Sequence, residues 1–133
     1  MAIEQTVLEA KRYGVVSCDP QASLLLAAQR MVEEDISALV VVGSDGSLQG
    51  LISRTDLMRA LIDDQNWQNR SVAEYMNPDV VTVSEDASIQ EVANILLDRQ
   101  IHRVVVVKKY PEQNLPISVV SAADIVYHMT RKS

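Results

Sequence analysis

Apolar positions along the chain follow two alternating patterns. Residues 88–99 place apolar side chains three and four positions apart, which predicts a helix with one buried face. The matching stretch, residues 23–34, opens with five consecutive apolar residues and predicts a helix covered on more than one side. The runs 40–42 and 104–107 are β-branched and unalternated, which is typical of strands buried on both faces. Each half therefore predicts a short helix, a strand, a helix, two strands and a helix.

The two halves form an internal repeat. Ala22 and Ile36 match Ala87 and Ile101 at a shift of 65 positions, and Ser53 matches Ser121 after a longer loop. The expected fold class is α/β (α+β), with one β-α-β-β-α repeat in residues 1–65 and another in residues 66–133. Because a unit this small buries too little surface alone, we expect the two repeats to pack about a pseudo-two-fold axis into one core.

Several predicted helices begin with a hydroxyl residue followed three positions later by an acid. This spacing is typical of capping boxes, in which each side chain bonds the backbone N–H of the other residue. Thr6/Glu9, Ser71/Glu74 and Ser88/Glu91 are interpreted as caps only. Ser53/Asp56 and Ser121/Asp124 each follow a buried strand, and a carboxylate there also suits a ligand with two adjacent hydroxyls. Helix capping and ligand binding therefore remain alternative roles for Ser53/Asp56 and Ser121/Asp124.

Composition excludes several classes of protein. A net charge of −6 argues against a nucleic-acid surface built on phosphate contacts. No apolar run approaches the roughly 18 residues of a membrane span, and the first residues lack the basic segment of a secretory signal. Cys18 is the only cysteine, so we expect no internal disulfide and no cysteine-based metal site. A cytoplasmic protein is the expectation.

The residues that could bind a ligand are one pair of basic residues and the polar residues where a strand meets a helix. The four glycines follow no phosphate-loop order, Cys18 lacks an activating partner, and no residue set suggests catalysis, so no enzyme activity and no metal are expected. His102 and Arg103 open a run of four valines in an acidic chain. These two side chains either are polar residues exposed to water at the start of a strand or bind a phosphate through charge-assisted hydrogen bonds.

Four segments in a fixed order resemble a tandem pair of cystathionine-β-synthase (CBS) domains, also called a Bateman module. They are residues 75–83, 86–89, 101–107 and 50–56. Residues 36–39 and 101–104 are most similar to the nucleotide-binding pair of the γ subunit of AMP-activated protein kinase. The resemblance implies sensing of an adenine nucleotide (AMP first, otherwise ADP, ATP or S-adenosylmethionine) in the cleft between the repeats, and signalling to an unidentified protein.

The resemblance also assigns roles to individual residues. Aspartates matching Asp56 and Asp124 hold the ribose hydroxyls, and His102 and Arg103, with Arg54 nearby, would hold the phosphate. The adenine would lie against Ser17, Ala22, Ile36, Thr82, Ala87 and Ile101. The remaining candidate ligand-binding residues, close in sequence to Asp56 or Asp124, are Leu51, Ser53 and Ser121.

The repeats differ at the positions expected to bind ligand. Ser37 and Ala38 replace His102 and Arg103 in the first repeat, and Ser118, expected near the ligand path, replaces Gly50 in the second. One strong site per chain is therefore expected. The resemblance also implies a homodimer through the helices at 56–62 and 124–130, with Leu57, Met58, Leu61, Ile125, Val126 and Met129 at the interface. The alternative is a ligand-free module that dimerises and docks a partner.

Overall fold

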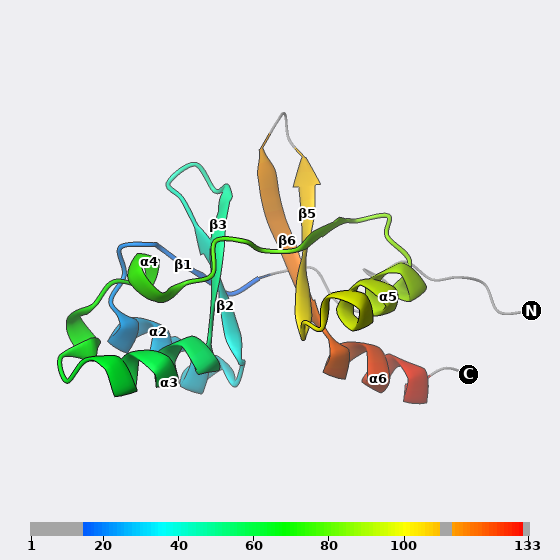
Figure 1. The fold of residues 1–133 in the computed structure, drawn as a ribbon. Helices are drawn as coiled ribbons and strands as arrows, with labels where there is room; N and C mark the ends of the chain where they lie inside the picture. Colours follow the sequence, from blue (N-terminus) through cyan, green and yellow to red (C-terminus); the bar gives the residue numbers. More distant parts are fainter. Residues whose placement is uncertain (1–14, 110–112, 132–133) are drawn as a thin grey trace, which may run out of the picture. The chain divides into compact units, whose positions relative to one another are not determined.

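The structure is a computed structural model of the 133-residue chain, and it describes residues 15–109 and 113–131 (Figure 1). The predicted cap at Thr6 and Glu9, and the short helix expected to open the first half, lie outside the described residues. The described chain divides into one compact unit of residues 16–80 and another that contains residues 81–131. Each unit is described by itself.

The unit of residues 16–80 is a three-stranded sheet with helices. Its strands are β1 (Ser17–Cys18), β2 (Ala38–Val42) and β3 (Leu48–Ser53), in the order β1-β2-β3. Strands β1 and β2 are parallel, whereas β2 and β3 are antiparallel. Helix α2 (Leu24–Glu34) connects the parallel pair, and α3 (Arg54–Asp63), a 3₁₀ turn (Trp67–Asn69) and α4 (Val72–Tyr75) follow the sheet.

The second unit repeats this plan. Strands β4 (Thr82–Ser84), β5 (Arg103–Lys109) and β6 (Asn114–Ser121) lie in the order β4-β5-β6, again with one parallel and one antiparallel pair. Helix α5 (Ile89–Arg99) connects β4 to β5, and α6 (Ala122–Arg131) follows β6. The predicted α/β (α+β) fold class is therefore confirmed, and the predicted helices at 23–34 and 88–99 are found with Ser23 and Ser88 as their N-caps.

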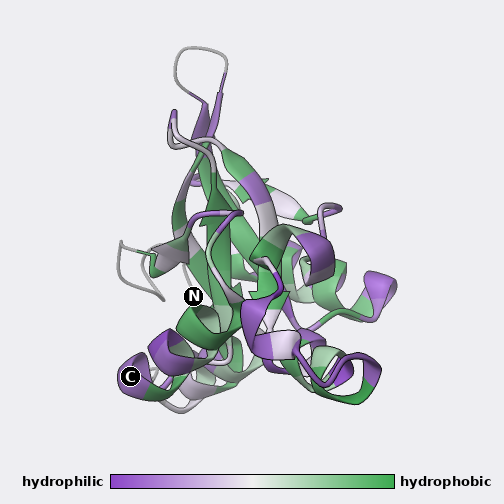
Figure 2. Cartoon of the chain, turned by 90° about the vertical axis from the view of Figure 1, so that its left-hand side faces the viewer, coloured by the Kyte–Doolittle hydropathy of each residue, from purple (hydrophilic) through white to green (hydrophobic). Residues whose placement is uncertain are grey.

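Each unit buries its own apolar cluster on the side of the sheet that carries its helices. In the first unit Leu24, Leu39 and Ile52 are fully buried in this cluster, and in the second Val92 and Val104 are. Figure 2 shows the strands largely in the green of hydrophobic residues, whereas the helices carry both green and purple stretches. The unalternated valine runs are buried along their middles, as predicted for strands with two covered faces.

Helices α2 and α5 end in the same way, at positions matched by the repeat. Asp35 and Gln100 adopt the left-handed conformation, with φ of 53° and 55°. The N–H of Ile36 then bonds the carbonyl of Met31 at 3.0 Å, and Ile101 bonds Leu96 at 3.1 Å. This 6→1 hydrogen bond, with an apolar residue after the left-handed position, is the Schellman motif. Both isoleucines consequently pack against the cluster of their own unit.

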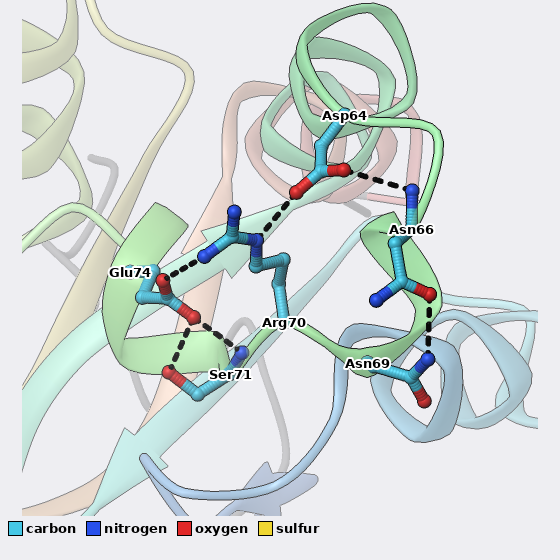
Figure 3. A network of polar contacts seen from close by, with 6 residues as sticks. All are labelled: Asp64, Asn66, Asn69, Arg70, Ser71 and Glu74. Carbon is cyan, nitrogen blue, oxygen red and sulfur yellow. Dashed lines mark hydrogen bonds and ion pairs between the residues drawn. The ribbon is translucent and has the colours of Figure 1, made fainter.

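The segment between the two sequence repeats is tied down by a polar network (Figure 3). Arg70 donates from Nε to Asp64 and from Nη1 to Glu74 Oε1, the latter at 3.1 Å. Glu74 Oε2 accepts from the backbone N–H and the hydroxyl of Ser71, at 2.9 and 3.2 Å. Asp64 also accepts from the N–H of Asn66 at 2.8 Å. The network joins the end of α3 to the start of α4, and the Ser71/Glu74 cap predicted from the sequence is confirmed.

Backbone hydrogen bonds attach the same segment to the first sheet and its helix. The carbonyl of Arg70 accepts from Leu24 N–H, and Val72 N–H donates to the carbonyl of Ala22, each at 2.8 Å. Leu51 and Asn77 exchange two backbone bonds, at 2.9 and 3.0 Å, on the outer edge of β3. Residues 66–80, which by sequence begin the second repeat, are thus part of the compact unit of the first sheet.

Candidate nucleotide-binding site

The corner at which β3 meets α3 contains Ser53 and Asp56. Asp56 Oδ2 accepts from the N–H of Ser53 at 2.8 Å and from its hydroxyl at 3.0 Å, and the Asp56 N–H approaches Ser53 Oγ at 3.4 Å. The predicted capping box is therefore present. Asp56 Oδ1 pairs with Arg59 Nη1 at 3.0 Å. Oδ2 therefore accepts two hydrogen bonds and Oδ1 one, so Oδ1 still has an acceptor site for a ligand hydroxyl, which would lie beside Arg59.

The corner between β6 and α6 has the same geometry. Asp124 Oδ2 accepts from the N–H and the hydroxyl of Ser121 at 2.8 and 3.0 Å, and the N–H of Asp124 donates to Ser121 Oγ at 3.1 Å. The position that corresponds to Arg59 is occupied by Tyr127, 68 positions later in the sequence. The two candidate ribose acceptors therefore share a cap but differ in the residue one turn further along the helix.

Strand register places three candidate residues of the first repeat on one face of their sheet. Ser17 pairs with Val40, which also pairs with Leu51, and Ser53 pairs with Ala38, two positions before Val40. Side chains of register partners, and of residues two apart on a strand, point to the same face. Ser17, Leu51 and Ser53 therefore lie on the face opposite the helix-side cluster.

The second sheet arranges its candidates in the same way. Arg103 is the register partner of Ser121, and Thr82 pairs with Val105, two positions beyond Arg103. Arg103, Ser121 and Thr82 are half-buried and share one face. Directly opposed antiparallel residues have Cα atoms about 4.5–5.5 Å apart, so the Arg103 side chain starts beside the Ser121–Asp124 corner.

The other candidates lie elsewhere. Ala87 is 6% exposed within the cluster of its unit, and Ala22 packs against the cluster of the first unit. With Ile36 and Ile101 in the Schellman motifs, four of the proposed adenine contacts have structural roles in packing.

Arg54 is exposed at the first position of α3, and His102 is exposed just before β5, where its carbonyl accepts from the N–H of Ala122 at 2.9 Å. Ligand binding by these residues stays a prediction.

A cavity of about 330 Å³ lies in the first unit, beside the ends of β1 and β2. Two sequence-predicted site residues, Ser17 and Ala22, line it. The sequence analysis missed the other lining residues, which are Cys18, Asp19, Leu26, Arg30, Val42 and Gly43. Arg30 could have been noticed in the sequence because it is the only basic residue of helix α2.

Burial raises the pKa of the Cys18 thiol to about 11, an effect that the positive charge of Arg30 opposes and the carboxylate of Asp19 reinforces. Cys18 is therefore almost entirely protonated at neutral pH and should react only slowly with thiol reagents. Within residues 15–109 and 113–131, no three His, Cys, Asp or Glu side chains form a group that could hold a metal ion. No helix in the described chain is long and apolar enough to cross a membrane.

Comparisons with known proteins agree with the repeat and with the fold. The family model "CBS domain" matches residues 8–63 and 72–131. Hypoxic response protein 1 of Mycobacterium tuberculosis is 30% identical over 125 residues, which cover 93% of this chain and 85% of the relative.

Two solved structures share the fold. The CBS domain pair of protein MJ0100, in complex with 5-methylthioadenosine and S-adenosyl-L-methionine, superposes with a TM-score of 0.87 at 24% identity, over 98% of this chain and all of the other. CBSX2 in complex with AMP gives a TM-score of 0.80 at 20% identity, over 95% of this chain and 96% of the other. Because the family model matches both halves, the chain belongs to the CBS-domain family and carries two CBS domains in tandem.

Proposed function

We propose that the protein is a regulatory module that binds an adenine nucleotide in the cleft between its two CBS domains and signals its occupancy to another protein. AMP is the ligand we expect first. The observation that carries the proposal is the shared face of β4, β5 and β6, on which Arg103, Ser121 and Thr82 lie. A guanidinium beside hydroxyl groups and a helix start suits a phosphorylated nucleoside.

The ligands of the two solved relatives support the same class. One binds S-adenosyl-L-methionine and 5-methylthioadenosine, and the other binds AMP. All three ligands contain adenosine, whereas only AMP carries a phosphate. The nucleoside is therefore the element that we expect this chain to share with its relatives, and Arg103 and His102 are the residues that we expect to add preference for a phosphate.

The mechanism of signalling would be differential binding. A nucleotide that contacts both CBS domains favours whichever arrangement of the domains brings its two sets of contacts together. In this proposal Asp56 holds the ribose hydroxyls and Arg103 holds the phosphate. A partner that recognises one arrangement would then bind in proportion to nucleotide occupancy.

Calorimetric titration with AMP and with adenosine tests the proposal. AMP should bind more tightly than adenosine, because a charge-assisted hydrogen bond contributes roughly 1.5–3 kcal/mol, or about ten- to a hundred-fold in affinity. Arg103→Ala should remove most of that preference while leaving adenosine binding unchanged. Lys109→Ala, on the same strand but at its exposed end, is the matched control. Equal affinities for AMP and adenosine would refute the phosphate contact, and no binding of either would refute the nucleotide site.

A second candidate function rests on Asp56 itself. Its carboxylate already bonds Ser53 and Arg59, as expected of a residue that only caps a helix. Helices α3 and α6 also expose large apolar side chains, including Met58 and Leu61 on α3 and Met129 on α6. A ligand-free module that dimerises and docks a partner would need only these features. The calorimetric titration separates the two functions, because a ligand-free module binds neither AMP nor adenosine, whereas the proposed site binds AMP and should lose affinity in Asp56→Asn.

A further inference from the structure

The cavity of the first unit is lined by a cationic side chain, Arg30, that forms no ion pair with another residue of the described chain. Arg30 lines the cavity and is half-buried, and no carboxylate of the described chain lies within ion-pair distance of it. Asp19 also lines the cavity, but it is exposed and its Oδ1 accepts from the N–H of Gln21 at 2.7 Å in a local turn. A guanidinium presents five N–H donors, so a half-buried one without an acid leaves strong donors available to a ligand.

The repeat supplies an internal comparison for this arginine. Ile95 occupies the position 65 residues after Arg30, on helix α5, and packs against the cluster of its own unit. The fold therefore accepts an apolar residue at this position of the helix and does not require an arginine. Leu26 and Val42, which also line the cavity, are apolar neighbours of this charge.

We propose that this cavity binds the phosphate or carboxylate group of a small ligand, with Arg30 as its charge-assisted donor. A volume of about 330 Å³ suits a small molecule rather than a macromolecule. The inference goes beyond the proposed nucleotide function, whose phosphate contacts are in the second repeat. In the first repeat, uncharged Ser37 and Ala38 stand at the positions of His102 and Arg103. Arg30 would give this repeat a positive charge for an anionic group.

Cys18 offers a direct readout, because it is the only cysteine of the chain and lines the same cavity. The experiment follows the rate at which a small thiol reagent modifies Cys18, at constant ionic strength, while inorganic phosphate, acetate, AMP or adenosine is added. Phosphate or acetate should slow the modification, and the more protective anion identifies the preferred group. Adenosine, which has no anionic group, should protect less than AMP.

Arg30→Gln tests the role of the arginine. The anion concentration needed for half-protection should rise about tenfold or more, because one charge-assisted contact is lost. Arg30→Lys should retain part of the protection, which shows that charge rather than folding is responsible. Arg99→Gln, an exposed arginine in the last turn of α5, should behave as the native protein. Each variant is compared with its own rate without anion, because Arg30 itself affects the pKa of Cys18.

Two results would overturn the inference: no anion changes the rate at Cys18, or Arg30→Gln is protected as well as the native protein. These results are distinct from failure of the proposed function. AMP binding in calorimetry without protection of Cys18 refutes the cavity site and leaves the nucleotide function intact. Protection by phosphate without nucleotide binding in calorimetry supports the cavity site and refutes the nucleotide function.

Discussion

Gly50 shows how a single residue is constrained by its neighbours. A Cβ atom at this position would lie 2.7 Å from Met76 Sδ and 2.9 Å from the carbonyl oxygen of Asn77. The glycine therefore lets the segment after α4 pair with the edge of β3. From the sequence we expected the matching residue, Ser118, to lie near the path of a ligand. The close neighbours of Gly50 are protein atoms, and Ser118 is fully buried within the second unit.

Replacing Gly50 by alanine should lower the free energy of unfolding by about 1–3 kcal/mol, as overpacking typically does. The carbonyl of Asn77 is backbone and cannot move without breaking its pairing with Leu51. Gly43→Ala is the control, because its Cβ would meet only the side chains of Gln49 and Asp45, at 3.1 and 3.2 Å. Urea denaturation measures both, and equal losses of stability would contradict this explanation.

Arg59 occupies one of the acceptor sites on Asp56 Oδ1 that a ribose hydroxyl could otherwise use. The Arg59 side chain is 59% exposed, and its Nη1 donates to Asp56 Oδ1 at 3.0 Å. An exposed ion pair of this kind contributes about 0.2–1 kcal/mol, so Arg59→Gln should raise nucleotide affinity by up to about fivefold. Calorimetry with AMP measures the change, with Arg99→Gln as the control. Weaker binding by Arg59→Gln would show instead that Arg59 contacts the nucleotide.

At the scale of elements, local hydrogen bonds define where helices begin and how the repeats are joined. Five helices of the described chain begin after a serine that forms hydrogen bonds with the following turn, and these serines are Ser23, Ser53, Ser71, Ser88 and Ser121. The segment after α3 reads as a polar connection in the sequence. Its carboxylates nevertheless accept several hydrogen bonds each, so the segment has a defined conformation rather than acting as a free linker.

The same bonds make this segment sensitive to acid. The N–H of Ser71, more than the charge of Arg70, lowers the pKa of Glu74 from its ordinary value of 4.5, and the N–H of Asn66, followed by Arg70, lowers the pKa of Asp64 from 3.8. A carboxyl whose pKa is lower in the folded state stabilises the fold above its ordinary pKa and loses this effect as the pH falls toward the folded value.

Glu74→Gln should therefore be less stable than the native protein at pH 7, and the difference should close as the pH falls below about 4.5. Urea midpoints measured at pH 7 and pH 3 test this expectation. Glu33→Gln, at an exposed position of α2, serves as the control for removing one negative charge. A difference in midpoint that stays constant with pH would show that the charge of Glu74 contributes nothing.

At the scale of the whole molecule, we expect the exposed apolar residues of α3 and α6 to favour self-association. Met58, Leu61 and Ile62 are 59%, 58% and 83% exposed, and Val126 and Met129 are 57% and 65% exposed. Leu57 and Ile125, which we expected on the same surface from the sequence, pack into the clusters of their own units instead, and Ile125 is only 8% exposed. The remaining residues still form exposed apolar stripes on both helices.

We expect the protein to sediment as a dimer at tens of micromolar, an order of magnitude typical of modest association. Leu61→Asp should raise the dissociation constant at least about tenfold, because it places a charge in an apolar interface. Val32→Asp, an 82% exposed position on α2, should leave the dimer unchanged. A monomeric native protein at that concentration, or equal effects of the two substitutions, would contradict an interface formed by α3 and α6.

The amino-acid sequence by itself determined the repeat, the fold class, and the starts and ends of α2 and α5, because apolar periodicity and serine caps act over a few neighbouring residues. Only the tertiary structure decided which candidate residues share a sheet face, since strand register depends on pairing between distant segments. Ser17, Leu51 and Ser53 are brought together in this way, whereas Ala22 and Ile36 face the core. Long-range packing likewise placed Arg30 beside Cys18 and residues 66–80 on the first sheet, relations that no local pattern encodes.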